Sequence, residues 1–215
     1  MPARSSTFSN ESEQHQIRLR ILAQARADFF ATGYSQFTMD ALAAELGMSK
    51  KTLYVYFAGK DEIIAALIDH LATEIRADAD ALLSNRELNL AEKLRGFVEG
   101  MVERLSTLHP RTVRDLQRYA PKLYAKIEEV RGVNVPYIFG RFVEAGQAEG
   151  LVRTTLPPGF AIEFFLHAMH GMMNPATLDR LRLAPRDIIP IAIDLFFGGL
   201  LTNAGRKQYE KLFPR

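Results

Sequence analysis

Residues 38–60 of the 215-residue chain read TMDALAAELGMSKKTLYVYFAGK. The pattern predicts two short helices joined by a tight turn. Thr38 and Ser49 each stand just before a helical run, where a hydroxyl can accept a hydrogen bond from an unpaired backbone amide. Gly47 stands between the two runs, where we expect a turn without room for a side chain. The stretch therefore predicts a helix-turn-helix.

The two short helices must pack against each other through apolar side chains. The positions on their inward faces are Leu42, Ala43, Leu46, Leu53 and either Tyr56 or Phe57. Ala43 has to be small, because the helix axes cross within about 8–10 Å of each other. The start of the second helix then faces outward with basic, hydroxyl and aromatic side chains.

These outward side chains have the chemistry that reads a DNA major groove, since Lys, Thr and Tyr all hydrogen-bond to base edges. We expect Thr38, Tyr56 and Lys60 to contact phosphates instead. Each residue also has an ordinary structural interpretation, as a cap, a solvated lysine or a core aromatic, so the prediction depends on their combination. The candidate DNA-binding residues are Thr38, Ser49, Lys50, Lys51, Thr52, Tyr54, Tyr56 and Lys60.

The charge distribution supports this interpretation. The net charge is only +2, but residues 15–60 hold six Lys and Arg against three acids, whereas residues 61–215 hold 20 of each. The basic surplus therefore lies beside the candidate DNA-reading element, as expected for a nucleic-acid partner.

Composition excludes several other classes. The chain has no cysteine, which excludes disulfides, thiolate catalysis and thiolate-bound metals. Residues 1–14 are polar and lack the apolar core of a secretory signal, so we expect a disordered tail and a cytoplasmic protein. The apolar stretch near residues 188–201 is interrupted by Pro190 and Asp194 and is too short for a membrane span.

Apolar residues recur at three- and four-residue spacing along the rest of the chain, and no segment alternates as a strand does. The fold class is therefore all-α, with about nine helices. Besides the two short helices, we expect one helix that ends at residue 33 and one that begins at residue 59. Five more helices are expected at residues 88–108, 111–119, 121–149, 160–173 and 186–201. Pro136 should kink or divide one of them. We expect a DNA-binding head at 15–62 and a helical body at 63–215.

A series of short motifs follows in order along the head: Gly33-Tyr34, Phe37-Thr38, Leu42-Ala43, Leu46-Gly47, Ser49, Thr52-Leu53-Tyr54, Tyr56-Phe57 and Lys60-Asp61. Together they resemble the tetracycline-repressor (TetR) family, over about residues 15–70. The resemblance implies an all-helical homodimer in which a three-helix head binds a palindromic operator and the larger body binds a small ligand that releases DNA. By position, it makes residues 50–57 the recognition helix and Lys60 a phosphate contact.

Two stripes in the last predicted helices combine large apolar with small residues, which permits close helix packing. The candidate dimer-interface residues are Phe160, Phe164, His167, Gly171, Ile188, Ile191, Leu195 and Gly199. The alternative is that these stripes belong to the core of a single chain.

Aromatic, methionine and histidine side chains in the body can line an apolar cavity with a few polar groups, as ligand pockets usually have. The candidate pocket residues are His109, Tyr119, Tyr124, Tyr137, Phe142, Phe165, Met169, His170 and Met173. Each has an alternative place in the ordinary core. No metal or cofactor is expected, because no nearby carboxylate pair completes a ligand set around His167 and His170.

These observations predict a ligand-responsive regulator, a repressor that is released from DNA by a small apolar or amphipathic molecule. Two alternatives remain. The first is a DNA-binding architectural protein without a ligand. The second is an all-α enzyme that uses ionisable groups such as Glu163 and Asp194, although no nucleophile and base motif or phosphate-binding glycine loop is present.

Overall fold

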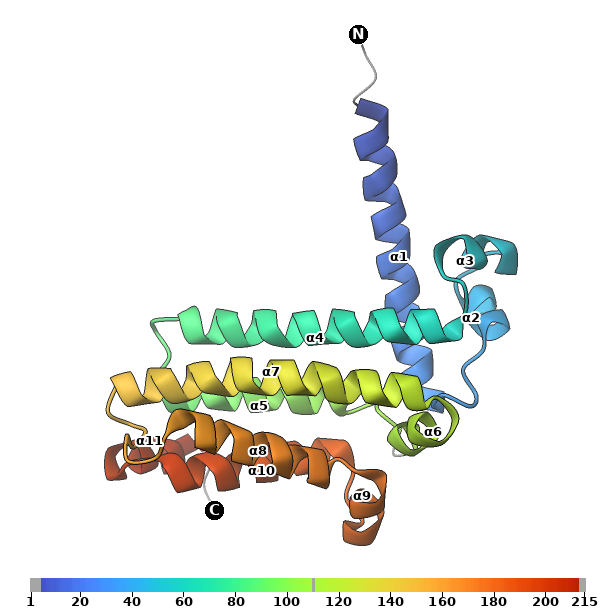
Figure 1. Ribbon diagram of the computed structural model, residues 1–215. Helices are drawn as coiled ribbons and strands as arrows, with labels where there is room; N and C mark the ends of the chain where they lie inside the picture. The colour runs from blue at the N-terminus through green and yellow to red at the C-terminus, as the bar shows by residue number, and fades with distance from the viewer. Residues whose placement is uncertain (1–4, 110, 213–215) are drawn as a thin grey trace.

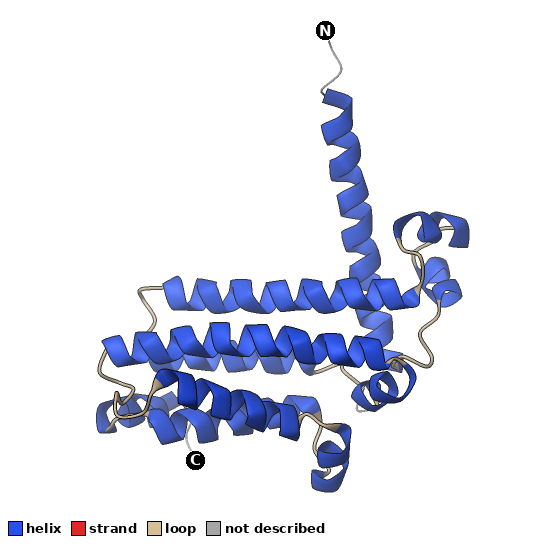
Figure 2. Ribbon diagram, in the orientation of Figure 1, coloured by secondary structure: helices blue, strands red, loops and turns tan. Residues whose placement is uncertain are grey.

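The computed structural model describes residues 5–109 and 111–212, and it describes the side chains of residues 12–109 and 111–211. Helices make up most of this part of the chain (Figures 1 and 2): α1 (Ser5–Thr32), α2 (Met39–Glu45), α3 (Lys50–Tyr56), α4 (Lys60–Ser84), α5 (Leu90–Leu105), α6 (Thr112–Tyr119), α7 (Pro121–Ala148), α8 (Pro158–Met172), α9 (Pro175–Leu181), α10 (Pro185–Leu200) and α11 (Asn203–Leu212). The described residues form no strand, and Val152 and Leu201 make one isolated antiparallel bridge. The all-α prediction is confirmed.

The described residues form eleven helices instead of about nine, and α9 and α11 account for the difference. Both are short, so neither builds a periodic apolar stripe that the sequence would reveal. The start of α9 is nevertheless well specified, because the side chain of Asn174 accepts a hydrogen bond from the backbone N of Ala176 at 3.0 Å and Pro175 occupies the first turn.

One expectation about a helix end was wrong, and one of the two effects expected of Pro136, division of the helix, does not occur. Helix α1 begins at Ser5, so residues 5–14 continue the helix instead of forming a disordered tail, while residues 1–4 lie outside the described residues. Extending an existing helix adds one hydrogen bond per residue without a new nucleation step, and no Gly or Pro interrupts this segment. Helix α7 runs through Pro136 without being divided. Its packing against α4 and α8 offsets the single amide hydrogen bond that proline removes.

The helices enclose two apolar clusters. The head cluster joins α1, α2, α3 and the first turns of α4 with Leu116 of α6 and Leu123 of α7. The body cluster joins α5, α7, α8 and α10. In Figure 1, α4 and α7 lie side by side along the body, and α1 crosses their ends at a steep angle. Helices α4, α6 and α7 therefore connect the head to the body.

Candidate DNA-binding head and inner cavity

Both helices of the predicted pair begin at capped ends. Thr38 Oγ1 accepts a hydrogen bond from the backbone N of Ala41 at 3.2 Å, and Ser49 Oγ accepts one from the backbone N of Thr52 at 3.0 Å. The capping prediction is confirmed. Gly47 has φ of +63°, but a Cβ placed there would meet nothing within 4 Å. Glycine is therefore favoured by the left-handed backbone conformation and not by a lack of space.

The inward faces pack as predicted. Leu42, Ala43, Leu46 and Leu53 are buried, and Phe57 is the aromatic residue that turns fully into the head, whereas Tyr56 stays half-buried. Their burial keeps α2 and α3 in contact, so the first turns of α3 remain at the surface.

The outer face of α3 carries Lys51, Tyr54 and Val55 at helical spacing. Tyr54 is 46% exposed and Val55 is 77% exposed. The sequence did not indicate Val55 as a candidate DNA contact, because a valine between two tyrosines has no polar group. An exposed aliphatic side chain on this face can contact a thymine methyl group.

Several charged and polar side chains around α3 already have partners. Lys50 Nζ lies 2.8 Å from Asp40 Oδ1, and this carboxylate raises the pKa of Lys50. Lys60 Nζ lies 4.0 Å from the centre of the Tyr34 ring and donates a hydrogen bond to the Tyr34 carbonyl at 3.3 Å. Burial and a 2.8 Å hydrogen bond to Asp61 raise the pKa of Tyr34 to about 12, so its phenol remains a donor at neutral pH.

Two arginines of the basic surplus hold the head together. Arg18 Nη1 donates to the Tyr56 carbonyl at 2.5 Å, and its guanidinium lies 4.1 Å from the centre of the Phe57 ring. Arg20 Nη2 donates to the Leu46 carbonyl at 2.9 Å. Both satisfy carbonyls at helix ends that would otherwise lack partners. The charge count therefore overstates the number of cations that are free to meet a phosphate.

The body contains an apolar cavity of about 280 Å³. Side chains from α1, α4, α5, α6, α7, α8 and α10 line it. Four of the predicted pocket residues lie on its wall: Tyr124, Phe165, Met169 and Met173. The sequence did not indicate the contributions of α1, α4, α5 and α10, because a cavity assembled from seven helices has no local pattern.

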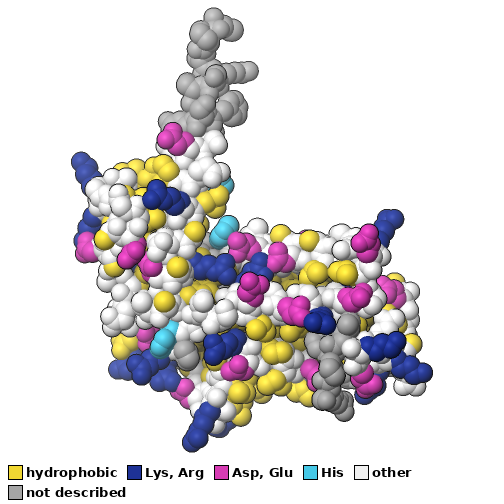
Figure 3. Space-filling view, turned by 180° about the vertical axis from the view of Figure 1, so that it is seen from behind, with side chains coloured by type: hydrophobic (Ala, Val, Ile, Leu, Met, Phe, Trp, Pro, Cys, Tyr) yellow, Lys and Arg dark blue, Asp and Glu magenta, His cyan; other side chains and the backbone are white. Residues whose placement is uncertain are grey.

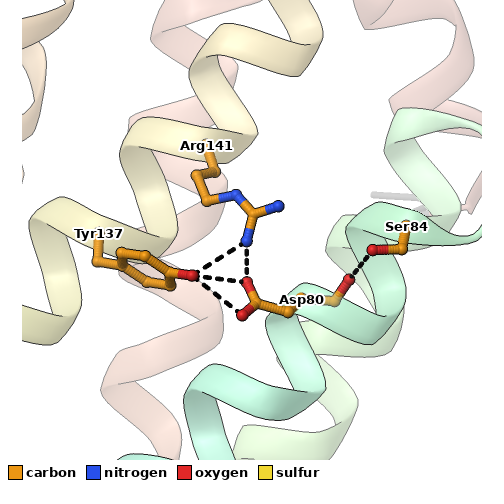
Figure 4. A network of polar contacts seen from close by, with 4 residues as sticks. All are labelled: Asp80, Ser84, Tyr137 and Arg141. Atoms are coloured by element: carbon orange, nitrogen blue, oxygen red, sulfur yellow. Dashed lines mark hydrogen bonds and ion pairs between the residues drawn. The ribbon is translucent and has the colours of Figure 1, made fainter.

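The other predicted pocket residues lie elsewhere: His109, Tyr119, Tyr137, Phe142 and His170. Phe142 is fully buried, with its ring centroid 5.7 Å from that of Phe97 and 6.4 Å from that of Phe197. Tyr119 is 53% exposed. The phenol of Tyr137 donates to Asp80 Oδ2 at 3.0 Å in a network with Arg141, which also binds Asp80 and links α7 to α4 (Figure 4).

The two histidines of the predicted pocket set, His109 and His170, each contact another residue of the chain. His109 Nδ1 accepts a hydrogen bond from the backbone N of Arg111 at 3.1 Å. His170 Nδ1 lies 2.5 Å from Glu128 Oε2, and Glu128 Oε1 lies 2.5 Å from Arg131 Nη1. Of these side chains, Arg131 reaches the cavity wall. In the described part of the chain, no group of three His, Asp or Glu side chains is placed to hold a metal ion.

Comparisons with known proteins agree with this arrangement. The sequence model of the family described as "Bacterial regulatory proteins, tetR family" matches residues 21–67, which span α2, α3 and the flanking parts of α1 and α4. The resemblance of the head to the TetR family is therefore confirmed. Over 184 residues the chain is 22% identical to YvaF of Bacillus subtilis (strain 168), named an uncharacterized HTH-type transcriptional regulator, covering 86% of this chain and 95% of that protein. The matched segment is the head of a DNA-binding transcriptional regulator.

Solved structures share the fold of this chain. A transcriptional regulator from Cytophaga hutchinsonii superposes with a TM-score of 0.64 at 18% identity, covering 87% of this chain and 99% of that one. SmeT of Stenotrophomonas maltophilia, the repressor of the multidrug efflux pump SmeDEF, has a TM-score of 0.60 at 17% identity, covering 87% and 92%. SmeT has also been solved as a complex with triclosan, with a TM-score of 0.60 at 16% identity, covering 87% and 93%.

Most of the predicted interface residues form an exposed face on α8 and α10. Seven of the eight are exposed: Phe160, Phe164, His167, Gly171, Ile191, Leu195 and Gly199. Ile188 is only 4% exposed, because it packs into the body cluster with Ile189 and Ile193. Apolar side chains also gather on the lower part of the body in Figure 3. None of the described helices is both long and apolar enough to span a membrane.

Proposed function

We propose that this chain is a repressor, acting in the cytoplasm, that binds a palindromic operator as a homodimer and leaves it when a small apolar or amphipathic molecule fills the cavity. One observation supports the link between ligand and DNA most directly. Phe29 and Phe30 of α1 lie on the cavity wall and also belong to the head cluster, together with Ile21 and Leu53. A ligand against these rings therefore contacts the packing that holds α3.

The face on α8 and α10 supports the homodimer. Large apolar side chains exposed together mark an interface more often than a free surface. A dimer doubles the DNA contacts of one head and presents two of them to a two-fold symmetric site.

Footprinting with the full chain tests the repressor proposal. The protein should protect a palindrome whose half-sites are about one helical turn, or a multiple of it, apart. Triclosan, which occupies SmeT, serves as a first effector. A Val135→Trp variant, which fills the cavity, is the control: it should bind the same DNA without responding to any effector. Protection without a preferred sequence would instead favour an architectural protein.

The assignment of α3 as the reading helix predicts the effect of Lys51→Ala. Among described residues no ion pair engages Lys51, and its side chain is exposed. Losing one base contact should weaken operator binding roughly 10- to 100-fold, or about 1–3 kcal/mol, and relax sequence preference at one position. Tyr54→Ala should act similarly. Fluorescence anisotropy measures the DNA affinity of both variants, and Lys122→Ala, which removes an exposed lysine of α7, is the control. Unchanged binding by both α3 variants would contradict the assignment.

Lys60 should instead act as a phosphate contact. Its Lys60→Ala variant should weaken binding to all sequences alike and reduce the slope of log affinity against log salt by about one. To contact a phosphate, the Lys60 ammonium must either move away from the Tyr34 ring or bind the phosphate while it remains above that ring. Titrations at several salt concentrations measure the slope, and a slope equal to that of the wild type would exclude this contact.

A further inference from the structure

One residue that lines the cavity has a buried polar atom without a hydrogen-bond partner. Thr112 lies at the start of α6 and is 1% exposed, and its Oγ1 makes no hydrogen bond with any described residue. Thr112 is also part of the cavity lining. A buried hydroxyl without a partner is unfavourable, which makes this atom the natural anchor for a ligand group.

The polar side chain of Asn134, also on the wall, is already satisfied. Its Oδ1 accepts a hydrogen bond from Arg76 Nε at 2.5 Å, and its Nδ2 donates to the Ala72 carbonyl at 3.0 Å. Asn134 therefore ties α7 to α4 and has its main donor and acceptor occupied.

The charge on the wall is also compensated. Arg131 is paired with Glu128, and Glu128 in turn contacts His170. Burial, followed by the Glu128 carboxylate, raises the pKa of Tyr124, so that phenol is neutral at physiological pH. An ionised ligand would lose its hydration here without a free counter-charge. The wall therefore favours an uncharged molecule.

Thr112 stands where the body meets the head. A Cβ placed on Gly33 would lie 3.6 Å from Thr112 Oγ1 and 3.3 Å from Asp115 Oδ2. Asp115 Oδ2 accepts a hydrogen bond from Ser35 Oγ at 2.8 Å. Gly33 and Ser35 belong to the joint between α1 and α2, so the unpartnered hydroxyl lies directly beside the start of the helix-turn-helix.

We propose that the cavity binds an uncharged, largely apolar molecule whose one hydroxyl or carbonyl group hydrogen-bonds to Thr112 Oγ1. This inference rests on the proposed function and adds the chemical class of the effector and the residue that selects it. Thr112 thereby distinguishes a neutral alcohol or ketone from the corresponding acid or amine, and it holds the polar end of the ligand beside the joint to the head.

Calorimetry with three probes of equal chain length tests the proposal: 1-decanol, decanoate and decyltrimethylammonium. The full-length wild type should bind 1-decanol at least about tenfold more tightly than either ion. Thr112→Val, which keeps the shape and removes the hydroxyl, should weaken 1-decanol binding about tenfold. Thr112→Ser keeps the hydroxyl and should retain most of the affinity. Without ligand, Thr112→Val should have an equal or higher Tm, because a methyl group replaces a hydroxyl that lacks a partner.

Four outcomes would overturn the inference. Tighter binding of decanoate or decyltrimethylammonium would mean that Arg131 or Glu128 selects the ligand, and the ligand-responsive function would stand. Equal affinity of the wild type and Thr112→Val for 1-decanol would remove Thr112 from the site. Undiminished 1-decanol binding by Val135→Trp would place the probe outside the cavity. If the wild type binds none of the three probes and not triclosan, both this inference and the proposed ligand response fail.

Discussion

Leu195→Glu is expected to separate the protein into monomers and to abolish tight operator binding. Leu195 is 72% exposed on α10, on the same face as Ile191, and Phe164 is exposed on α8, which packs against α10. In a two-fold interface the substitution places a carboxylate in the apolar contact of each copy. Burying these charges without partners should raise the dimer dissociation constant at least about 100-fold, which corresponds to about 2.7 kcal/mol.

Light scattering coupled to gel filtration measures the mass, and anisotropy with operator DNA measures the functional consequence. Val133→Glu is the matched control, because Val133 is 55% exposed but lies on α7, outside this face. Circular dichroism should show the same helix content for both variants. A wild-type protein that is monomeric at micromolar concentration, or a Leu195→Glu variant that stays dimeric, would contradict the assignment of this face.

The helix-turn-helix was predictable because its signals are local. A cap needs only a hydroxyl beside a helical start, and Thr38 and Ser49 both provide it. The buried positions Leu53 and Phe57 follow from helical spacing within a few residues. Asp40 is different, because its pairing with Lys50 joins two helices and depends on the angle between them.

The body was less predictable because the role of each side chain depends on distant neighbours. Met169 and Phe142 are both buried apolar residues at helical spacing, yet Met169 faces the cavity and Phe142 packs among other rings. Ile188 and Leu195 are two helical turns apart and so lie on one side of α10, yet Ile188 is buried and Leu195 is 72% exposed. The sequence of α10 alone does not indicate which part of the helix is covered by neighbouring helices.

Phe142→Ala is expected to lower the free energy of unfolding by about 3–5 kcal/mol without specifically changing ligand selectivity. Phe142 is fully buried, and its ring meets those of Phe97 and Phe197, so truncation leaves a void in the centre of the body cluster. Urea unfolding followed by circular dichroism measures the loss, which corresponds to a Tm lower by roughly 6–20 °C for a chain of this size. Tyr119→Ala is the control from the same predicted pocket set, and because Tyr119 is exposed it should change stability by less than about 0.5 kcal/mol. Equal losses in the two variants would mean that Phe142 is not part of the packed core.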